Sequence, residues 1–402
     1  MIKVLHVVGG SSKNGAFKGA YILHKALLDL NIDSKVINDL EDKNTNQNLE
    51  KGIIYAYKSF FDELSFKVKI FIEKTIKTFF LPSPRETFTL SFFGLDVTKL
   101  EEYKNADIIH FHWLNQGFIS LKSLSKINKP AVWTMRDMWV FTGGSHYSMD
   151  FERYENSYLS NFVKKFKKKV FKDNFQFIAV SNWIKDKAKN SIVLKNREVI
   201  KIDNNIEIKD FRVIDKAEAR NFLGILTEKK VILYGAQNPQ SKRKGWDVFV
   251  ETLKILDKSN YYLLIFGNFW SQKILDDIGL EYKNLGYIDD QNKLNNIYSS
   301  SDIFVGSSLQ DAWPKTFAEA MLCGTPVVCF NNTSISEVVD HKKNGYVVEN
   351  IQPHELKNGI EWLATNNEDK KLSNNARQKI FEFDSKKIAK KYIDLYMNIL
   401  KK

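Results

Sequence analysis

Residues 302–330, which read DIFVGSSLQDAWPKTFAEAMLCGTPVVCF, constrain the fold more than any other stretch of the chain. Residues 302–306 are β-prone, a polar loop follows them, residues 315–322 favour a helix, and residues 325–330 are again rich in β-formers. Pro314 suits the start of a helix, and Gly324 suits the position just past its end. This order of strand, loop, helix and strand predicts a unit of a parallel α/β sheet.

The start of this helix is a candidate anion site. The free N–H groups around Thr316 and Phe317 are expected to point into the crevice at the strand ends, where helix N-termini bind phosphate groups. Two carboxylates flank the helix start, Asp311 in the loop and Glu319 one turn into the helix. An anion-binding helix start beside acids that can bind hydroxyl groups indicates a sugar nucleotide as ligand.

Length and composition limit the number of domains, the kinds of partner and the cellular compartment that are compatible with the sequence. A chain of 402 residues is too long for one ordinary core, and its 43% hydrophobic and 13% aromatic content can support two. The net charge of +12 favours phosphate-rich partners, namely nucleic acid, an anionic membrane surface or phosphorylated small molecules. The two cysteines, Cys323 and Cys329, offer no disulfide framework and no zinc spacing, which indicates a reducing compartment.

Targeting signals are not apparent in the sequence. The apolar run of residues 2–8 is too short for a signal peptide, and no segment reaches the ~18 apolar residues of a membrane span. We therefore expect a cytoplasmic protein, with peripheral attachment to the inner face of a membrane as a further option.

The first predicted domain covers residues 1–205. Residues 2–8, a Gly-bearing turn and a helix form a half-Rossmann start, although the turn lacks the G-x-G-x-x-G spacing, so a plain strand-to-helix turn is equally compatible. Further strands are expected within 34–39, 107–118, 130–135, 177–181 and 198–204. A helical insertion is expected at about 50–82, since apolar residues recur at helical spacing from residue 53 to residue 80.

Polar residues just past the strand ends of this domain are candidate site residues. In parallel sheets such positions line the ligand crevice. They include His112, Arg136 and Asp137, with His146 in the Gly-rich loop 140–150. His110 lies inside a strand and is interpreted as a core residue.

The second predicted domain covers residues 206–380, and a last helix in 381–402 is expected to return to the first domain. Strands are expected within 229–236, 261–268, 284–288, 302–306 and 325–330. The basic loop of Lys242, Arg243 and Lys244 follows the first of them. In a doubly wound sheet this loop and the start of the helix at 315–322 face one crevice.

A diphosphate held between a fixed lysine and a helix N-terminus is stabilised as it leaves, which is what glycosyl transfer from a nucleotide sugar requires. The sequence contains no Asp-x-Asp motif and no His/Cys cluster with metal-ligand spacing. We therefore expect side-chain cations in place of a metal, and no cofactor.

Two amphipathic segments have open interpretations. Residues 157–174 combine apolar residues at helical spacing with six lysines, which fits a solvated face on a packed helix, adsorption to an anionic membrane or, least of all, a nucleic-acid patch. The insertion at 50–82 fits either simple packing on the domain or a surface that faces lipid or acceptor.

The chain also resembles a known family, the bacterial glycosyltransferases of family 4 (group 1) with GT-B architecture, over nearly its whole length. Within that family it is most similar to the branch of exopolysaccharide, capsule and O-antigen biosynthesis. The strongest element is the family's pair of acids separated by seven residues, here Asp311 and Glu319 within QDAWPKTFAEAMLCGTPVV. Further similar segments are NGAFKGAYILHKAL, DIIHFHWLNQGF, VWTMRDMWVFTGGSHY, YGAQNPQSKRKG and NNIEIKDF.

The resemblance implies two tandem Rossmann-like α/β domains with an interdomain cleft, and it implies roles on the donor side. Glu319 would hold the ribose of the donor. Thr316 and Phe317 would donate backbone N–H groups to the diphosphate. Asp311 would contact the donor sugar, and Lys244 would pair with the diphosphate.

Further implied residues come from both predicted domains. Gly15 would let the loop of the first domain approach the diphosphate, and Asp137 and His146 would lie on the acceptor side. Relatives usually carry a histidine where Arg136 stands, and that histidine is expected to touch the donor sugar. Many relatives also carry an arginine at the Gly235-Ala236 position, and Arg243 or Lys242 would supply that charge here.

By this resemblance the protein is expected to be a retaining, metal-independent glycosyltransferase. It would move a sugar from a nucleotide-diphosphate sugar to a glycan or lipid-linked saccharide acceptor in surface polysaccharide biosynthesis. The alternatives are a sugar-nucleotide epimerase of the same architecture and an inactive scaffold adsorbed to a membrane.

Overall fold

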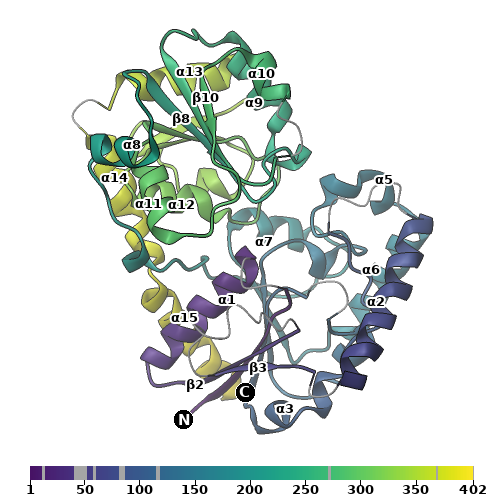
Figure 1. Ribbon diagram of the computed structural model, residues 1–402. Coiled ribbons are helices and arrows are strands. Elements are labelled where there is room, and N and C mark those ends of the chain that lie inside the picture. The colour runs from purple at the N-terminus through teal and green to yellow at the C-terminus, as the bar shows by residue number, and fades with distance from the viewer. Residues whose placement is uncertain are drawn as a thin grey trace. The chain divides into compact units, whose positions relative to one another are not determined.

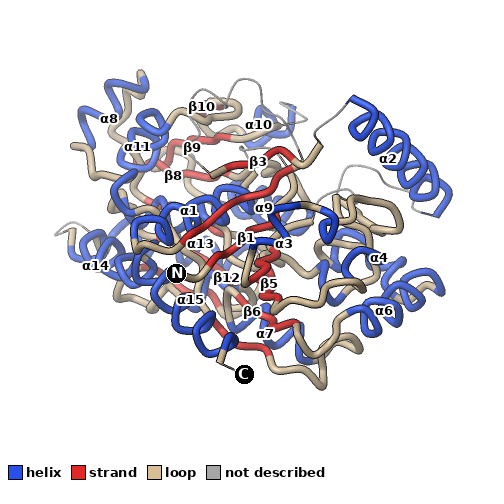
Figure 2. The backbone as a smooth tube through the Cα atoms, turned by 90° about the horizontal axis from the view of Figure 1, so that it is seen from below, coloured by secondary structure: helices blue, strands red, loops and turns tan. Residues whose placement is uncertain are grey.

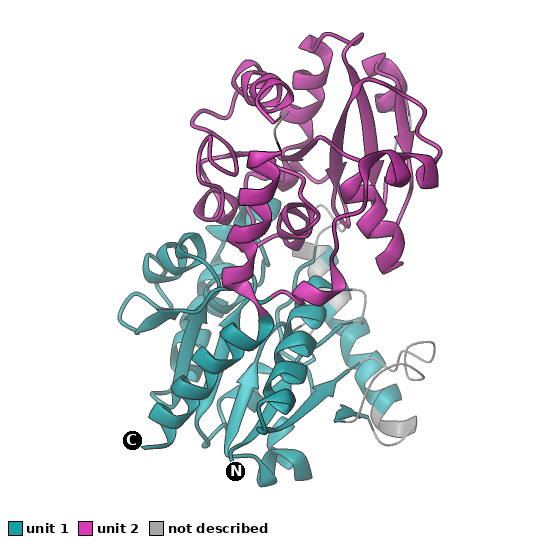
Figure 3. Ribbon diagram, turned by 90° about the vertical axis from the view of Figure 1, so that its left-hand side faces the viewer, with its two compact units in different colours: residues 1–205, 385–402 teal, residues 206–384 magenta. Residues whose placement is uncertain are grey.

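The computed structural model describes residues 1–10, 14–39, 52–57, 60–80, 87–114, 118–269, 273–367 and 370–401. The chain divides into two compact units (Figure 3). Unit 1 comprises Met1–Asn205 together with Ser385–Lys402, and unit 2 comprises Ile206–Asp384. The last segment of the chain therefore belongs to the same unit as the first.

Unit 1 is a parallel α/β unit. Its described residues form one seven-stranded sheet in the order β3-β2-β1-β4-β5-β6-β7. The strands are β1 (Lys3–Val7), β2 (Asp33–Asn38), β3 (Ile53–Tyr55), β4 (Ile108–Phe111), β5 (Ala131–Met135), β6 (Phe175–Ala179) and β7 (Val199–Lys201). The α-helices are α1 (Gly15–Asp29), α2 (Phe60–Phe80), α3 (Glu101–Asn105), α4 (Leu121–Leu124), α5 (Glu152–Glu155), α6 (Tyr158–Val170), α7 (Asn182–Lys189) and α15 (Ser385–Leu400).

The C-terminal helix α15 is part of the unit 1 core, where it lies along α1 (Figure 1). Its buried residues Ile388, Ala389, Tyr392 and Tyr396 belong to one hydrophobic cluster with residues of α1, β1, β4, β5 and β6. Two of its hydroxyl groups also meet polar groups inside the sheet. The hydroxyl of Tyr396 lies 2.6 Å from Nδ1 of His110, and Tyr392 lies 2.7 Å from Oγ1 of Thr134.

Part of the helical insertion that the sequence predicts is a strand at the edge of the unit 1 sheet. Residues Ile53–Tyr55 form strand β3 and pair in parallel with β2, so the predicted start of the helix at residue 53 is wrong. The helix itself, α2, lies at the periphery of the unit in Figures 1 and 2. It is anchored by the buried carboxylate of Glu73, which accepts the backbone N–H groups of Leu90 (2.7 Å) and Ser91 (2.9 Å).

Unit 2 repeats the same plan, with strands in red joined by helices in blue in Figure 2. Its described residues form a six-stranded parallel sheet in the order β10-β9-β8-β11-β12-β13. The strands are β8 (Lys230–Gly235), β9 (Tyr261–Phe266), β10 (Tyr282–Asn284), β11 (Ile303–Gly306), β12 (Val327–Phe330) and β13 (Gly345–Val348). The α-helices are α8 (Lys216–Leu223), α9 (Trp246–Ile255), α10 (Lys273–Ile278), α11 (Gln291–Ser299), α12 (Lys315–Leu322), α13 (Pro353–Thr365) and α14 (Lys371–Ile380).

The predicted pair of parallel α/β domains is confirmed, with one shift in unit 2. The strand expected at 284–288 lies at Tyr282–Asn284 instead. The chain cannot continue as a regular strand beyond it, because Gly286 has a φ of +66°, in the left-handed region.

The strand order of unit 2 reverses between β8 and β11, and ligands of open α/β sheets bind outside the carboxyl ends of strands at such a point. The basic turn Lys242–Lys244 follows β8 and ends at Gly245, which has a φ of +69°. A Cβ atom at Gly245 would overlap the carbonyl oxygen of Ser307, in the loop after β11. Glycine thus lets the two loops at the reversal pack backbone against backbone.

This close approach makes Gly245→Ala a test of how the loops are held. We expect the substitution to lower the free energy of unfolding by more than about 1 kcal/mol, because it adds both backbone strain and overlap with Ser307. Urea unfolding followed by tryptophan fluorescence measures the loss. Gly224→Ala is the matched control, since Gly224 has a similar φ of +62° but only the Lys283 Nζ atom, 3.4 Å away, near its missing Cβ. Equal losses in the two variants would contradict the account.

Candidate functional site

Two cations and one carboxylate meet at the reversal point of unit 2. Nζ of Lys244 forms an ion pair with Oδ2 of Asp311, and a guanidinium nitrogen of Arg243 lies 3.7 Å from the same oxygen. The Asp311 side chain is 7% exposed, and the Lys244 side chain is 13% exposed. A carboxylate this buried is stable only beside positive charge, so the cluster is a unit whose members position one another.

The backbone of the basic turn is fixed by hydrogen bonds from neighbouring loops. The carbonyl oxygen of Lys244 accepts from the hydroxyls of Tyr234 (3.1 Å) and Ser307 (2.9 Å). The carbonyl oxygen of Arg243 accepts the backbone N–H of Leu309 at 2.7 Å. Burial raises the pKa of Tyr234 well above its usual range, so its hydroxyl stays a neutral donor.

The start of α12 lies beside this cluster. Its Ncap residue is Pro314, whose side chain has no hydrogen-bonding group, so the first-turn N–H groups are not capped from within the helix. A small hollow of about 20 Å³, room for about one water molecule, adjoins the helix start. Its lining includes Lys244, Gly306, Ser307, Pro314, Thr316 and Phe317. A helix start and an ammonium group around one hollow are the groups that could hold an anion.

Glu319 lies one turn further along α12 and is held in place by α11. Its Oε2 atom accepts a hydrogen bond of 2.7 Å from the hydroxyl of Tyr298. Burial, together with the adjacent Glu319 carboxylate, raises the pKa of Tyr298 well above its usual range. Tyr298 is therefore a permanent donor that fixes the orientation of the carboxylate.

In unit 1, Asp137 and His146 form a buried pair at the carboxyl end of β5. Oδ2 of Asp137 lies 2.5 Å from Nδ1 of His146, and Oδ1 accepts the backbone N–H of Trp139 at 2.9 Å. The other ring nitrogen of His146 lies 3.0 Å from Oγ1 of Thr89. Nδ1 of His146 also lies 2.8 Å from the indole nitrogen of Trp113, so Asp137, Trp113 and Thr89 together hold the ring in position.

Arg136 points into unit 1 and not toward this pair. Its guanidinium donates to Oδ1 of Asn204 at 2.6 Å and to Nδ1 of His112 at 3.4 Å. A Cβ atom at Gly19 would overlap the guanidinium, so α1 also closes over it. Burial lowers the pKa of Arg136 to about 10, and the group stays charged at neutral pH.

Arg136 continues a stack of buried histidines from β1, from β4 and from the position just after β4. Nε2 of His112 lies 2.9 Å from Nδ1 of His6, and both nitrogens of His110 have hydroxyl partners in Thr134 and Tyr396. Burial lowers the pKa of all three histidines. Their ligand atoms lie within 4.8 Å of one another, as in a metal site. The residues do not fit a metal, since the nitrogens of His110 are engaged and the Arg136 charge would repel a cation.

Gly15 is the first residue of α1 and is exposed. A Cβ atom there would meet nothing within 4 Å, so the fold of unit 1 does not itself require glycine at this position. Residues 11–13 of the same turn lie outside the described residues.

Unit 2 thus brings Lys244, Thr316 and Phe317 together around one hollow. Asp311 and Arg243 adjoin it through the ion pairs of Asp311, and Glu319 lies one turn further along α12. In unit 1, Asp137 contacts His146, whereas Arg136 contacts Asn204 and His112. Sequence reasoning missed Tyr234, Tyr298 and Ser307, which hold the site residues in place. The spacing of these three residues offers no signal, because their contacts to Lys244 and Glu319 span 10, 21 and 63 residues of chain.

No described helix combines the length and the apolar character that a membrane crossing requires.

Residues 215–379 match the family described as "Glycosyl transferases group 1". Among curated proteins, an uncharacterized glycosyltransferase of Methanocaldococcus jannaschii is 25% identical over 304 residues, which cover 72% of this chain and 75% of the relative. The family match, residues 215–379, contains the whole candidate site of unit 2.

Two solved structures show the same fold. Sucrose-phosphate synthase of Thermosynechococcus elongatus superposes with a TM-score of 0.72 at 18% identity, covering 99% of each chain. HepE of Anabaena, solved in complex with UDP-glucose, superposes with a TM-score of 0.68 at 18% identity, covering 99% of this chain and 100% of its own. Residues 215–379 thus form a glycosyl transferases group 1 domain, within a chain that has the GT-B fold of glycosyltransferases.

Proposed function

We propose that this protein is a retaining glycosyltransferase that transfers a sugar from a nucleoside-diphosphate sugar to a glycan or a lipid-linked saccharide. The observation that carries the proposal is the cluster of Lys244, Arg243 and Asp311 beside the uncapped start of α12. The group 1 domain match covers these residues, and a structural neighbour binds UDP-glucose.

The resting cluster suggests how the donor is received. Lys244 and Arg243 are held on the Asp311 carboxylate before the donor arrives. The donor diphosphate would take over these cations and the N–H groups of Thr316 and Phe317. Asp311 would then turn its oxygens to hydroxyls of the donor sugar, and Glu319, oriented by Tyr298, would accept from the ribose hydroxyls.

In the proposed reaction the acceptor hydroxyl attacks the anomeric carbon on the face that the diphosphate leaves. The glycosidic C–O bond to the diphosphate breaks, the new C–O bond forms, and the acceptor proton passes to the departing phosphate oxygen. No protein nucleophile takes part. The positive charge of Lys244, Arg243 and the helix start stabilises the developing diphosphate, so we propose that no metal is needed.

On the acceptor side we propose that Asp137 and His146 act as one unit. Asp137 holds the imidazole, and the imidazole would contact the acceptor or the donor sugar. Arg136 would fix this edge of unit 1 through Asn204 and His112 and would make no direct sugar contact.

A panel of UDP-, GDP- and dTDP-sugars tests the proposal. We expect one donor to raise the unfolding temperature of the protein and to release nucleoside diphosphate in the presence of a lipid-linked saccharide acceptor. The product should keep the anomeric configuration of the donor by NMR, and the rate should persist in EDTA. Conversion of the donor without diphosphate release would indicate an epimerase, and binding without turnover would indicate an inactive scaffold.

Lys244→Ala tests the charge that receives the leaving group. We expect it to raise the barrier to turnover by about 3 kcal/mol, or roughly a hundredfold in kcat, as for the loss of one preorganised charge-stabilising donor. Lys254→Ala on α9, an exposed lysine paired with Glu251, is the control and should keep its rate. Turnover of Lys244→Ala near that of the control would remove Lys244 from the reaction.

We also propose that α6 attaches the protein to an anionic membrane surface. Tyr158, Phe162 and Phe166 lie along one face of the helix and are 97%, 58% and 36% exposed. Lys165 and Lys169 fall on the same face by helical spacing. A merely solvated face would not need these exposed rings, whereas rings between lysines suit the headgroup region of a bilayer.

The opposite face of α6 is fixed in unit 1. Val163 and Val170 are buried there, and the ammonium of the buried Lys167 lies 3.5 Å from the centre of the Trp139 ring and 3.1 Å from the carbonyl oxygen of Thr142. Burial lowers the pKa of Lys167 well below its usual range. The exposed rings are therefore not an alternative core face of the helix.

Sedimentation with phosphatidylglycerol vesicles tests the membrane proposal. Replacing Lys165 and Lys169 by Gln should weaken binding roughly 25-fold, since each basic residue near an anionic surface contributes about 1 kcal/mol. Replacing Tyr158 and Phe162 by Ser should also weaken it. The control replaces Lys187 and Lys189 on α7 by Gln and should bind as the unmodified protein does. Equal binding of the α6 and α7 variants would refute the proposal.

A further inference from the structure

Unit 2 contains a second and larger cavity at the edge of its sheet opposite the candidate donor site. Its lining includes Lys230, the first residue of β8, together with Asp302 and Thr325, which precede β11 and β12. These positions mark the amino ends of the strands, whereas Lys244 and Asp311 follow the carboxyl ends. The cavity volume of about 880 Å³ is in the range of small-molecule sites.

One cation in the wall of this cavity is already neutralised within the protein. Arg220 donates to Oδ2 of Asp302 at 2.7 Å and to the carbonyl oxygens of Ser300 and Thr227, both at 3.1 Å. Lys216 lies 2.5 Å from the other oxygen of Asp302. Asp302 and Arg220 therefore hold the wall together, and the hydrogen bonds of Arg220 are directed to groups of the protein.

Arg377 on α14 is different. One of its nitrogens donates to the carbonyl oxygen of Leu322 at 2.9 Å, and its guanidinium lies 5.8 Å from the Phe381 ring. Among the described residues, no carboxylate forms an ion pair with it. A half-buried guanidinium in a cavity wall, balanced by no acid, favours an anion with the planar hydrogen-bonding geometry of a phosphate or carboxylate.

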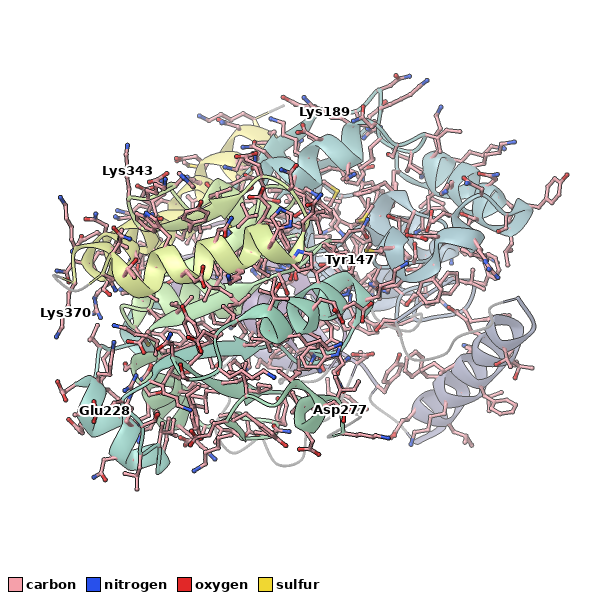
Figure 4. The ribbon with its side chains drawn as sticks, turned by 90° about the horizontal axis from the view of Figure 1, so that it is seen from above. Tyr147, Lys189, Glu228, Asp277, Lys343 and Lys370 are labelled. Atoms are coloured by element: carbon pink, nitrogen blue, oxygen red, sulfur yellow. The ribbon has the colours of Figure 1, made fainter. Side chains whose placement is uncertain are left out.

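The rest of the wall favours a ligand with several hydroxyl groups. Neutral hydrogen-bonding side chains line the cavity, among them Asn221, Asn374 and Ser373, and apolar walls come from Ile225 and Leu363. Lys370 and Glu228, labelled in Figure 4, belong to the exposed part of the lining and come from the start of α14 and the loop before β8. Carboxamides can both donate to and accept from sugar hydroxyls.

We propose that this cavity binds a phosphorylated sugar, with the phosphate on Arg377 and the hydroxyls on the neighbouring amide and hydroxyl groups. The ligand would act as a regulator, because the cavity is built on the far end of α12. Arg377 holds Leu322, the last residue of α12, and Cys323 and Gly324 line the cavity.

A second connection runs through α11. Thr325 at the cavity wall donates to the carbonyl oxygen of Tyr298 at 2.5 Å, and the hydroxyl of Tyr298 holds Glu319. The eight residues of α12 span only about 12 Å, so one short helix joins the cavity to the anion site at its start. A phosphate that draws Arg377 away from Leu322 would move α12 and change the affinity for the donor. This coupling rests on the proposed function, whereas the cavity itself does not.

Calorimetric titration of the full chain with hexose 1- and 6-phosphates tests the site. We expect at least one of them to bind with a Kd below about 1 mM, and glucose and inorganic phosphate to bind at least tenfold more weakly. Arg377→Gln should weaken hexose phosphate binding at least tenfold, since the amide can still donate to Leu322 but carries no charge. Lys379→Gln on the same helix, which lies outside the cavity lining, is the charge-matched control and should leave binding unchanged.

Ala364→Phe, which fills the cavity from α13, provides a second and independent variant and decides the result if Arg377→Gln does not fold. Failure of every hexose phosphate to bind, unchanged binding in the cavity variants, or equally tight binding of inorganic phosphate would overturn the proposal.

The coupling is measured by titrating UDP or GDP, whichever binds, with and without saturating hexose phosphate. We expect the nucleotide affinity to change at least threefold in the unmodified chain and not in Ala364→Phe, because coupling between two sites is reciprocal. Unchanged nucleotide affinity with the cavity filled would overturn the regulatory role. Hexose phosphate binding without any nucleotide binding would refute the proposed function and leave the cavity site standing.

Discussion

The ion pair between Lys244 and Asp311 is the interaction on which the candidate site depends. It forms only because two loops from β8 and β11 meet where the strand order of unit 2 reverses, and they meet closely because Gly245 has no side chain to strike Ser307. A buried carboxylate or ammonium alone would be costly, often by several kcal/mol, and each makes the other tolerable. The pair therefore holds the Lys244 ammonium at a buried point beside the start of α12, where we propose that the diphosphate binds.

The same logic explains why the supporting residues matter. Tyr234 and Ser307 hold the backbone of the basic turn, and Tyr298 holds Glu319. Each of these three hydroxyls is uncharged and donates a hydrogen bond to an acceptor in the site. None of them therefore competes with the charged groups for the proposed nucleotide sugar. Catalysis by charge stabilisation requires this kind of preorganisation, because groups that must first rearrange lose most of their advantage.

Much of this arrangement could be predicted from sequence, for local physical reasons. Pro314 and Gly324 bound α12 at the residues where the structure has it, because both act through their own backbone geometry. Short apolar runs in the sequence predict the buried strands, and the order of these strands and the helices between them predicts two parallel α/β domains. The prediction of helix for Ile53–Tyr55 is wrong because a strand of three residues is too short to show a periodicity in the sequence. Its strand conformation depends on pairing with β2.

What sequence could not supply is contact between distant residues. The pairing of Tyr298 with Glu319 and the histidine stack depend on the packing of α11 on α12 and on the register of β1 with β4, where His6 pairs with His110. The sequence singles out Arg136 by its place just past a strand end and as a departure from the family that the chain resembles. In the structure it is committed to Asn204 and His112, which leaves Asp137 and His146 as the polar pair at that edge.

A crystal structure of the protein with its preferred nucleoside diphosphate would test the central claim most directly. The account predicts that the diphosphate lies against the backbone N–H groups of Thr316 and Phe317, with the Lys244 ammonium on a phosphate oxygen and no longer on Asp311. A diphosphate bound elsewhere in unit 2, with the Lys244–Asp311 pair intact, would contradict it.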